Sequence, residues 1–321
     1  MSGFENYMSD QFINRNTLVG YKTVISRILG NTEINDVYIG KNARLYEVPS
    51  AYDENKIKDT TDAMNAFINN CGIENKYFML VPNATFIIPE NLPLFALPEN
   101  QKEIIDIINN SVSDSVKTID CVSAFQNYSD REKLYFNTDH HWTSYAAYVA
   151  FSEYAKTAEI EVNPDNYSEI VLTDSFYGTL ASSSGVYNNK DIIRAILPDN
   201  IDGTYMVENS ETKEKSASVF VPEKLLQKNS YEVFFGGNFS KIVISTINAN
   251  NKNLLVFKDS FANCFLPLLI PHYENIVIID PRYFSGEISN VLEDYNFTDV
   301  LYIYNLNTFL EDTVLKDISI N

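Results

Sequence analysis

The stretch LLVFKDSF, residues 254–261, joins four apolar residues to a polar turn and decides the expected fold class. A short apolar run without alternation is typical of a strand that is covered on both faces. Two runs of the same kind follow, IVII at 276–279 and VLYIY at 300–304, with helix-length gaps between them. Strands that alternate with helices in this way predict an α/β fold with a mostly parallel central sheet and right-handed connections.

The first half of the chain repeats this alternation. YFMLVP at 77–82 is a continuous apolar run, a helix is expected around 102–110, and a second strand is expected around 116–122. Strand, helix and strand in that order predict a βαβ unit. A further helix is expected over 143–155, so both halves of the chain are expected to build one sheet.

The remaining segments complete the expected domain. Residues 17–29 and 54–71 have helical periodicity, and residues 37–48 predict a hairpin. We interpret the polar, Asn- and Ser-rich residues 160–245 as a β-rich insertion that packs on the main sheet. We therefore expect one domain over 1–321, composed of an N-terminal helical and hairpin segment (1–75), the first half of the sheet (76–159), the insertion (160–245) and the second half of the sheet with the candidate nucleophile (246–321).

Charge and composition exclude several classes of protein. The chain has 24 Lys and Arg against 43 Asp and Glu, a net charge of −19, which disfavours nucleic acid and anionic membrane surfaces as partners. The three cysteines (71, 121 and 264) are far apart and odd in number, so they predict neither a disulfide framework nor a zinc site. The longest apolar run, 265–271, is too short to cross a membrane. Residues 1–20 lack the pattern of a signal peptide, so either the protein is cytoplasmic or an export segment lies outside this sequence.

Ser260 is the first candidate for chemistry, because it lies where the strand at 254–257 meets the next helix. A serine in such a turn exposes its hydroxyl, and its N–H group is free because the first helical donors lack partners. Free donors of this kind can bind an oxyanion. The alternative is that Asp259 and Ser260 only cap the helix. Cys264 is interpreted as a small buried hydrophobe and not as a second nucleophile.

The segment TDHHW at 138–142 holds two of the three histidines and precedes a predicted helix. An imidazole is suited to proton transfer near neutral pH, and a carboxylate can orient it through its other nitrogen. In an extended loop Asp139 and His141 project to the same side, so His140 is expected to point the other way. The alternatives are a capping Asp139 beside a structural histidine, and a metal site of Asp139, His141 and His272. The metal site lacks helix spacing and a fourth ligand, so we expect no metal or other cofactor.

A third group of candidates follows two later strands. Arg282, after the strand at 276–279, could bind a carbonyl or sugar oxygen, or could pair with Asp280 or Asp259. Tyr283 beside it is a further substrate-binding candidate. Asn305 ends the last predicted strand, where its amide could donate to an oxyanion or serve only as a turn residue.

TDHHW followed by TSYAAY resembles the DHHW protein family of bacteria. Supporting stretches cover most of the chain: DQFINRN (10–16), INDVYIGKNARLYE (34–47), LVPNATFIIPENLPLFA (80–96), FGGN (235–238), LLVFKDSFANCFLPLLIPHYENIVIIDPRYF (254–284) and VLYIYN (300–305). That family resembles the alginate O-acetyltransferase group, whose SGNH-hydrolase-like, three-layer domain has a circularly permuted motif order.

The resemblance implies that the Asp-x-His pair precedes the nucleophile, as Asp139 and His141 precede Ser260 here. Asn305 matches the oxyanion asparagine more loosely, and Lys258 replaces the glycine of the GDS block.

The function that the resemblance implies is serine-dependent acyl-ester chemistry. His141, held by Asp139, would take the proton of Ser260, which attacks an acetyl ester. The protein would be an O-acetyltransferase or acetylesterase acting on a cell-envelope or extracellular glycan, with an extracytoplasmic location and a membrane-bound partner that could supply the acyl group. The alternative is a catalytically silent glycan-binding protein of the cell envelope that uses its Tyr- and Phe-rich surface.

Overall fold

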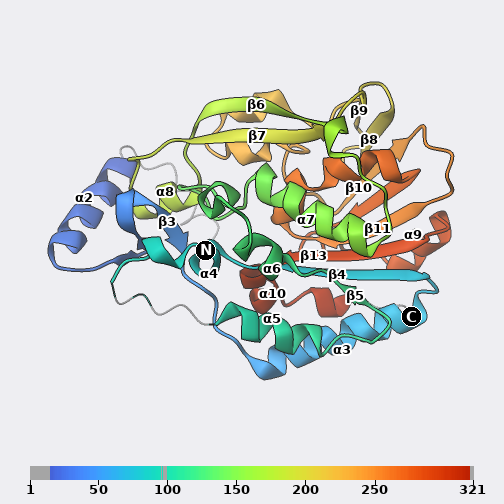
Figure 1. The fold of residues 1–321 in the computed structure, drawn as a ribbon, viewed down its shortest axis with the longest axis horizontal. Coiled ribbons are helices and arrows are strands. Elements are labelled where there is room, and N and C mark those ends of the chain that lie inside the picture. Colours follow the sequence, from blue (N-terminus) through green and yellow to red (C-terminus); the bar gives the residue numbers. More distant parts are fainter. Residues whose placement is uncertain (1–14, 95, 97–99, 319–321) are drawn as a thin grey trace.

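An eight-stranded sheet forms the centre of the computed structural model, which describes residues 15–94, 96 and 100–318 (Figure 1). In spatial order its strands are β5 (Lys117–Thr118), β4 (Asn75–Val81), β13 (Asp299–Asn305), β11 (Asn253–Lys258), β12 (Asn275–Ile279), β10 (Lys241–Thr246), β8 (Tyr205–Asn209) and β9 (Lys215–Ser216). The first five run parallel, and the last three are added antiparallel. The predicted mixed α/β fold with a mostly parallel sheet is therefore confirmed.

The apolar runs of the sequence form strands that are buried on both faces. In β4, Tyr77 and Met79 face one hydrophobic cluster, whereas Phe78 and Leu80 face another. Successive residues of a strand point to opposite faces, so a strand covered on both sides has no polar alternation. The first cluster includes residues of α7 (Ser144–Thr157) and of the 3₁₀ helices η7 (Ser260–Cys264) and η8 (Leu266–His272). The second includes residues of α3 (Glu54–Asn70), α5 (Gln101–Asn109), α9 (Ile288–Asp294) and α10 (Leu306–Glu311).

The N-terminal segment forms a separate small sheet. β1 (Glu33–Ile34), β2 (Val37–Ile39) and β3 (Leu45–Glu47) pair antiparallel, which confirms the predicted hairpin. The predicted first helix is α2 (Arg15–Ile28), at the edge of the molecule in Figure 1. Its Thr23 hydroxyl donates to the Ser184 carbonyl of α8 (Thr179–Ser184), which ties this segment to the middle of the chain.

The interpretation of residues 160–245 as an insertion that packs on the main sheet needs correction. β6 (Tyr167–Phe176) and β7 (Asp191–Pro198) do form a separate antiparallel ribbon. The strands that follow, however, extend the central sheet itself, because β10 pairs directly with β12. The physical reason lies in three consecutive buried apolar residues of β10, 242–244, which can occupy an interior position despite polar flanks.

The predicted strand at 116–122 is also corrected. Only Lys117 and Thr118 pair with β4. Asp120 ends the strand because its carboxylate accepts a hydrogen bond from the Ser123 N–H and caps α6 (Cys121–Gln126). Of the apolar residues that suggested a longer strand, Cys121 and Val122 are therefore the first turn of a helix. Another short helix of this region, α4 (Ala84–Ile87), follows β4.

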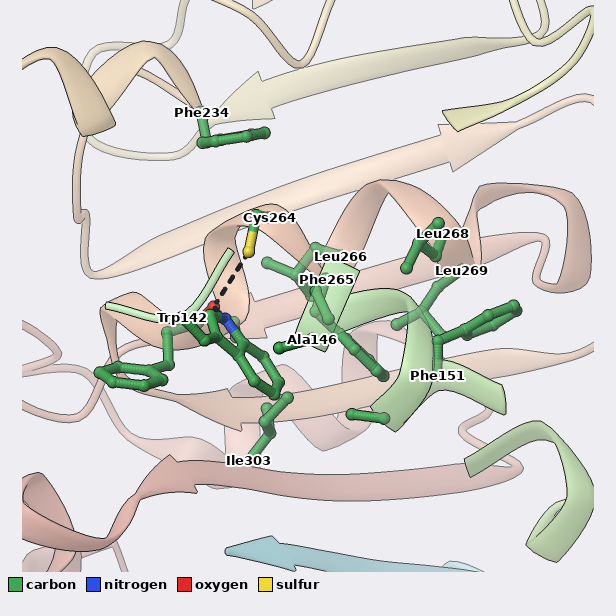
Figure 2. Close-up of a cluster of buried hydrophobic side chains, with 14 of the residues drawn as sticks. Trp142, Ala146, Phe151, Phe234, Cys264, Phe265, Leu266, Leu268, Leu269 and Ile303 are labelled. Atoms are coloured by element: carbon green, nitrogen blue, oxygen red, sulfur yellow. Dashed lines mark hydrogen bonds between the residues drawn. The ribbon is translucent and has the colours of Figure 1, made fainter. Parts of the chain in front are cut away.

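A cluster of apolar side chains fixes the position of η7 and η8 against α7. Figure 2 shows Trp142 and Phe151 beside Phe265, Leu268 and Leu269. The rings of Trp142 and Phe265 are stacked with their centroids 6.5 Å apart, and Phe151 meets Phe265 edge-on at 6.2 Å. This packing joins the segment of the two histidines to the segment of Ser260. Among the described residues, no helix is both long and apolar enough to span a bilayer.

Candidate active site

Ser260 is the first residue of η7, immediately after the strand β11 and the single linking residue Asp259. The Asp259 carboxylate caps η7 by accepting a hydrogen bond from the Phe261 N–H at 2.9 Å, and it also accepts one from the Asn305 N–H at 2.8 Å. Asp259 rather than Ser260 therefore fills the capping role. As the first helical residue, Ser260 has an N–H group that no carbonyl within η7 can accept.

His141 lies between Asp139 and Ser260. Its Nδ1 is 2.5 Å from Asp139 Oδ1, and its Nε2 is 2.8 Å from Ser260 Oγ. The segment 138–142 and the β11–η7 turn thus bring together an acid, an imidazole and a hydroxyl from positions 119 residues apart. In this arrangement a base can take the proton of a hydroxyl while a carboxylate orients the base.

Asp139 is held in place by its surroundings. Its Oδ1 accepts a hydrogen bond from the His141 N–H, and its Oδ2 accepts one from the Thr179 N–H at 2.8 Å. Gly178 leaves the space for this carboxylate, because a Cβ on Gly178 would lie 2.2 Å from Asp139 Oδ2. Asp191 supports the same segment, since it accepts hydrogen bonds from the N–H and hydroxyl of Thr138. The sequence analysis did not identify Gly178 or Asp191 as parts of the site. Because glycine is scarce in this chain, Gly178 could have indicated a position where the backbone is closely approached.

The protonation states suit proton transfer from Ser260. Burial alone would raise the pKa of Asp139, but the charges of His141 and His140 and the hydrogen bonds it accepts lower that pKa well below its usual range. Burial, followed by repulsion from His140, lowers the pKa of His141 to about 4, although Asp139 acts in the opposite direction. Near pH 7 Asp139 is therefore ionised and His141 is neutral, as a general base must be.

Tyr231 covers the other side of the imidazole. Its ring stacks on His141 with centroids 3.9 Å apart and an interplanar angle of 18°. Tyr231 is 3% exposed, so it excludes water from that face of His141. The sequence analysis missed this residue, which belongs to the short helix η6 (Ser230–Val233) just before the FGGN stretch.

Asn238, the last residue of FGGN, adjoins the Ser260 turn. Its Oδ1 accepts hydrogen bonds from Lys258 Nζ at 2.8 Å and from Asn263 Nδ2 at 3.2 Å. A carboxamide whose oxygen is used in this way keeps its Nδ2 hydrogens for another partner. In the sequence Asn238 is only the last residue of the FGGN stretch, and no pattern indicates its contacts with Lys258 and Asn263.

Comparison with known proteins places this site in a family. The DHHW protein family model matches residues 50–279. The chain belongs to the DHHW protein family. A comparison with curated protein sequences finds no match.

Solved structures share the fold of this DHHW protein. A DHHW family protein from Eubacterium siraeum has a TM-score of 0.74 and 23% identity, over 90% of this chain and 97% of that chain. Bacillus cereus PatB1 with a sulfonyl adduct has a TM-score of 0.75 and 21% identity, over 89% and 100% of the two chains. The O-acetyltransferase domain of Pseudomonas putida AlgJ has a TM-score of 0.55 and 12% identity, over 88% and 94%. At these identities the likeness shows the mixed α/β fold alone.

The sequence suggested that His140, the first histidine of the DHHW segment, points away from His141. The structure shows that it does not. The His140 and His141 rings lie side by side with centroids 3.9 Å apart. His140 Nδ1 is 2.7 Å from the hydroxyl of Thr179, the residue that also holds Asp139. The expected alternation fails because this loop is shaped by contacts with α8 and is not an extended strand. His140 therefore belongs to the surroundings of Asp139.

Asn305 has a different place from the one expected. Its Nδ2 donates to Asn83 Oδ1 at 2.6 Å and to the Val81 carbonyl at 3.2 Å, and its Oδ1 accepts from the Asn307 N–H. Both amide hydrogens are thus used within a fully buried network at the ends of β4 and β13. This corrects the expectation that Asn305 donates to an oxyanion.

Arg282 pairs with Asp280, which is one of the alternatives expected from the sequence. Its Nε and Nη2 form a bidentate ion pair with Asp280 at 2.8 and 2.6 Å, which raises the pKa of the guanidinium against the effect of burial. Tyr283 is 54% exposed, and its ring faces the Arg282 guanidinium at 5.7 Å. The structure thus places both at the strand end expected, with Arg282 already engaged by a carboxylate.

The metal alternative of Asp139, His141 and His272 is contradicted. Among the described residues, the group of three potential ligands at this site consists of Asp139, His140 and His141. His272 lies outside it, where its Nε2 is 3.1 Å from the Tyr167 hydroxyl. The ring nitrogens of His141 are already used by Asp139 and Ser260.

Proposed function

We propose that this DHHW protein carries out serine-dependent acyl-ester chemistry, as an O-acetyltransferase or acetylesterase acting on a cell-envelope or extracellular glycan. The observation that carries the proposal is the continuous chain from Asp139 through His141 to Ser260, with contacts of 2.5 and 2.8 Å. Without substrate bound, such contacts are often longer, so the hydroxyl is already in reach of its base.

The reaction would proceed in two acyl transfers. His141 Nε2 takes the Ser260 proton as Oγ attacks the carbonyl carbon of an acyl ester, and the same proton passes to the departing alcohol. An acyl-serine remains. A glycan hydroxyl or water then gives its proton to His141 and attacks the acyl carbon. As the bond between the acyl carbon and Ser260 Oγ breaks, His141 returns this proton to Oγ, which regenerates the free serine. Asp139 orients the imidazole and stabilises its positive charge throughout.

Two donors are proposed for the oxyanion that forms in each transfer. One is the Ser260 N–H at the start of η7, and the other is Asn238 Nδ2, whose amide oxygen is already engaged by Lys258. Donors that are fixed before the reaction stabilise developing charge without reorganisation. Asn238 thus replaces Asn305 in this role.

The likeness in fold to the O-acetyltransferase domain of AlgJ supports the choice of reaction, and the net charge of −19 favours a neutral glycan over an anionic one. We further propose an extracytoplasmic location and a membrane-bound partner that supplies the acyl group. In this proposal the order of Asp139, His141 and Ser260 along the chain is a circular permutation of the SGNH order.

The test is turnover of a chromogenic acetyl ester, together with labelling by a sulfonyl fluoride followed by peptide mass mapping. Ser260→Ala should lower kcat by at least about a thousandfold and abolish labelling, because the nucleophile is lost. Ser152→Ala, an exposed serine on α7, is the matched control and should behave as wild type. Turnover that survives Ser260→Ala would contradict the proposal. No turnover in the wild type, with glycan affinity indifferent to Ser260→Ala, would instead favour the glycan-binding protein.

A further inference from the structure

Lys258, two residues before Ser260, carries an ammonium group that is buried inside the protein. The residue is 1% exposed at the end of β11. Its Nζ lies 2.8 Å from Asn238 Oδ1, 2.9 Å from Asn263 Oδ1 and 3.5 Å from Asp280 Oδ2. Three acceptors of the protein thus surround the ammonium group.

Burying an ammonium group costs desolvation free energy unless the group is paired with an opposite charge and hydrogen-bonded. A lysine at this position is therefore unexpected on grounds of stability alone. Asp280 provides the opposite charge, but it is fully buried and shares its carboxylate with Arg282. Burial accordingly lowers the pKa of Lys258, while Asp280 opposes that shift. An apolar side chain at this position would fill the space without desolvating a charge.

The ammonium connects the turn that holds the candidate nucleophile to the FGGN turn. Lys258 and Asn263 flank Ser260 in the sequence, whereas Asn238 belongs to the FGGN turn. The turn contains three consecutive residues with positive φ, Phe235 at 60°, Gly236 at 83° and Gly237 at 123°. A non-glycine residue such as Phe235 rarely adopts this conformation unless its surroundings impose it. The hydrogen bonds to Asn238 are restraints at the end of this turn.

We propose that Lys258 is a positioning residue that fixes the Asn238 carboxamide for oxyanion binding. The inference rests on the proposed acyl-ester chemistry. The ammonium binds the amide oxygen, which selects the orientation in which Nδ2 is left for the substrate oxygen. Donation to Oδ1 also polarises the amide, which strengthens the N–H donors at its other end. Lys258 itself touches neither substrate nor reacting atoms.

The test is a double-mutant cycle on kcat with the chromogenic acetyl ester. Asn238→Ala should lower kcat about a hundredfold, as expected for the loss of one oxyanion donor. Lys258→Met should lower kcat about ten- to a hundredfold with KM changed less than about twofold, because the loss is felt in the transition state. Since Lys258 acts through Asn238, the double variant should be no slower than Asn238→Ala alone.

Two further variants separate positioning from folding. Lys258→Gln keeps a hydrogen-bond donor without a buried charge, so it should fold even if Lys258→Met does not, and it should retain more activity than Lys258→Met. Lys224→Met is the matched control: it breaks the Lys224–Glu232 ion pair near the same turn and should leave kcat unchanged.

Additive losses in the double variant, or an unchanged kcat in both Lys258 variants, would overturn the inference while leaving the proposed function intact. Absence of turnover in the wild type would overturn both.

Discussion

Replacing Trp142 with phenylalanine should weaken the fold and the candidate site together. Trp142 is fully buried, and its Nε1 donates to the Phe261 carbonyl at 2.7 Å. Because Trp142 follows His141 and Phe261 follows Ser260, this hydrogen bond helps to set the distance between imidazole and hydroxyl. Trp142→Phe removes the donor and part of the ring while keeping an aromatic side chain.

The expected magnitude follows from these two losses. A buried carbonyl left without its donor costs about 1–3 kcal/mol. The Cys264 thiol, 3.8 Å from the same oxygen, is too weak a donor to compensate. The void left by the smaller ring adds about 1 kcal/mol. The free energy of unfolding should therefore fall by about 2–4 kcal/mol, and the displaced turn should lower kcat about ten- to a hundredfold.

Urea unfolding followed by Tyr fluorescence measures the first effect, and acetyl-ester turnover measures the second. Tyr154→Phe is the matched control, since it removes a buried hydrogen bond to the Tyr273 hydroxyl in the same core, away from Ser260. It should lower stability while leaving kcat unchanged. If Trp142→Phe were destabilised to the expected extent but kept the wild-type kcat, the hydrogen bond would not position the site.

Two more predictions follow from the packing and protonation of the structure. Gly178→Ala should lower kcat at least about a hundredfold, because the added Cβ would displace Asp139. Gly20→Ala is the control and should keep the wild-type kcat, because its Cβ would make only ordinary contacts. Equal activity of the two variants would refute the steric argument. Burial, followed by repulsion from Lys252, lowers the pKa of His272 to about 4, so the folded protein stays unprotonated there while the unfolded chain binds a proton below about pH 6.5. The free energy of unfolding should therefore decrease as the pH drops from 7 to 4. In urea titrations this decrease should be smaller by about 3 kcal/mol for His272→Gln than for the wild type. An identical pH dependence in both proteins would contradict the lowered pKa of His272.

The parallel strands could be predicted because local sequence carries the information, whereas the meeting of Asp139 and His141 with Ser260 was implied by the resemblance of the TDHHW segment to the DHHW family. A continuous apolar run reports burial on both faces, and parallel strands bring their carboxyl ends to one edge of the sheet. What local sequence cannot report is which distant partner takes each hydrogen bond. Asn305 was misplaced for this reason, because its amide is taken by Asn83, 222 residues away.

The same limit explains the other errors. The side to which His140 turns depends on Thr179, which no spacing rule connects with it. The strand β10 was assigned to an insertion because its polar flanks hid an interior position beside β12. Asn238 and Tyr231 acquire their roles only when the FGGN turn folds against η7.

The pairing of β4 with β13 has a consequence for how the protein is made. These interior strands lie next to each other in the sheet, yet their contacts join residues 224 positions apart. Non-local pairing of this kind makes folding slow, because chain entropy is lost before the contacts form. While a ribosome is still making the last third, β4 lacks its neighbour and His141 has no hydroxyl to act on. The contact between His141 and Ser260, 119 residues apart, can therefore form only after both segments have been synthesised.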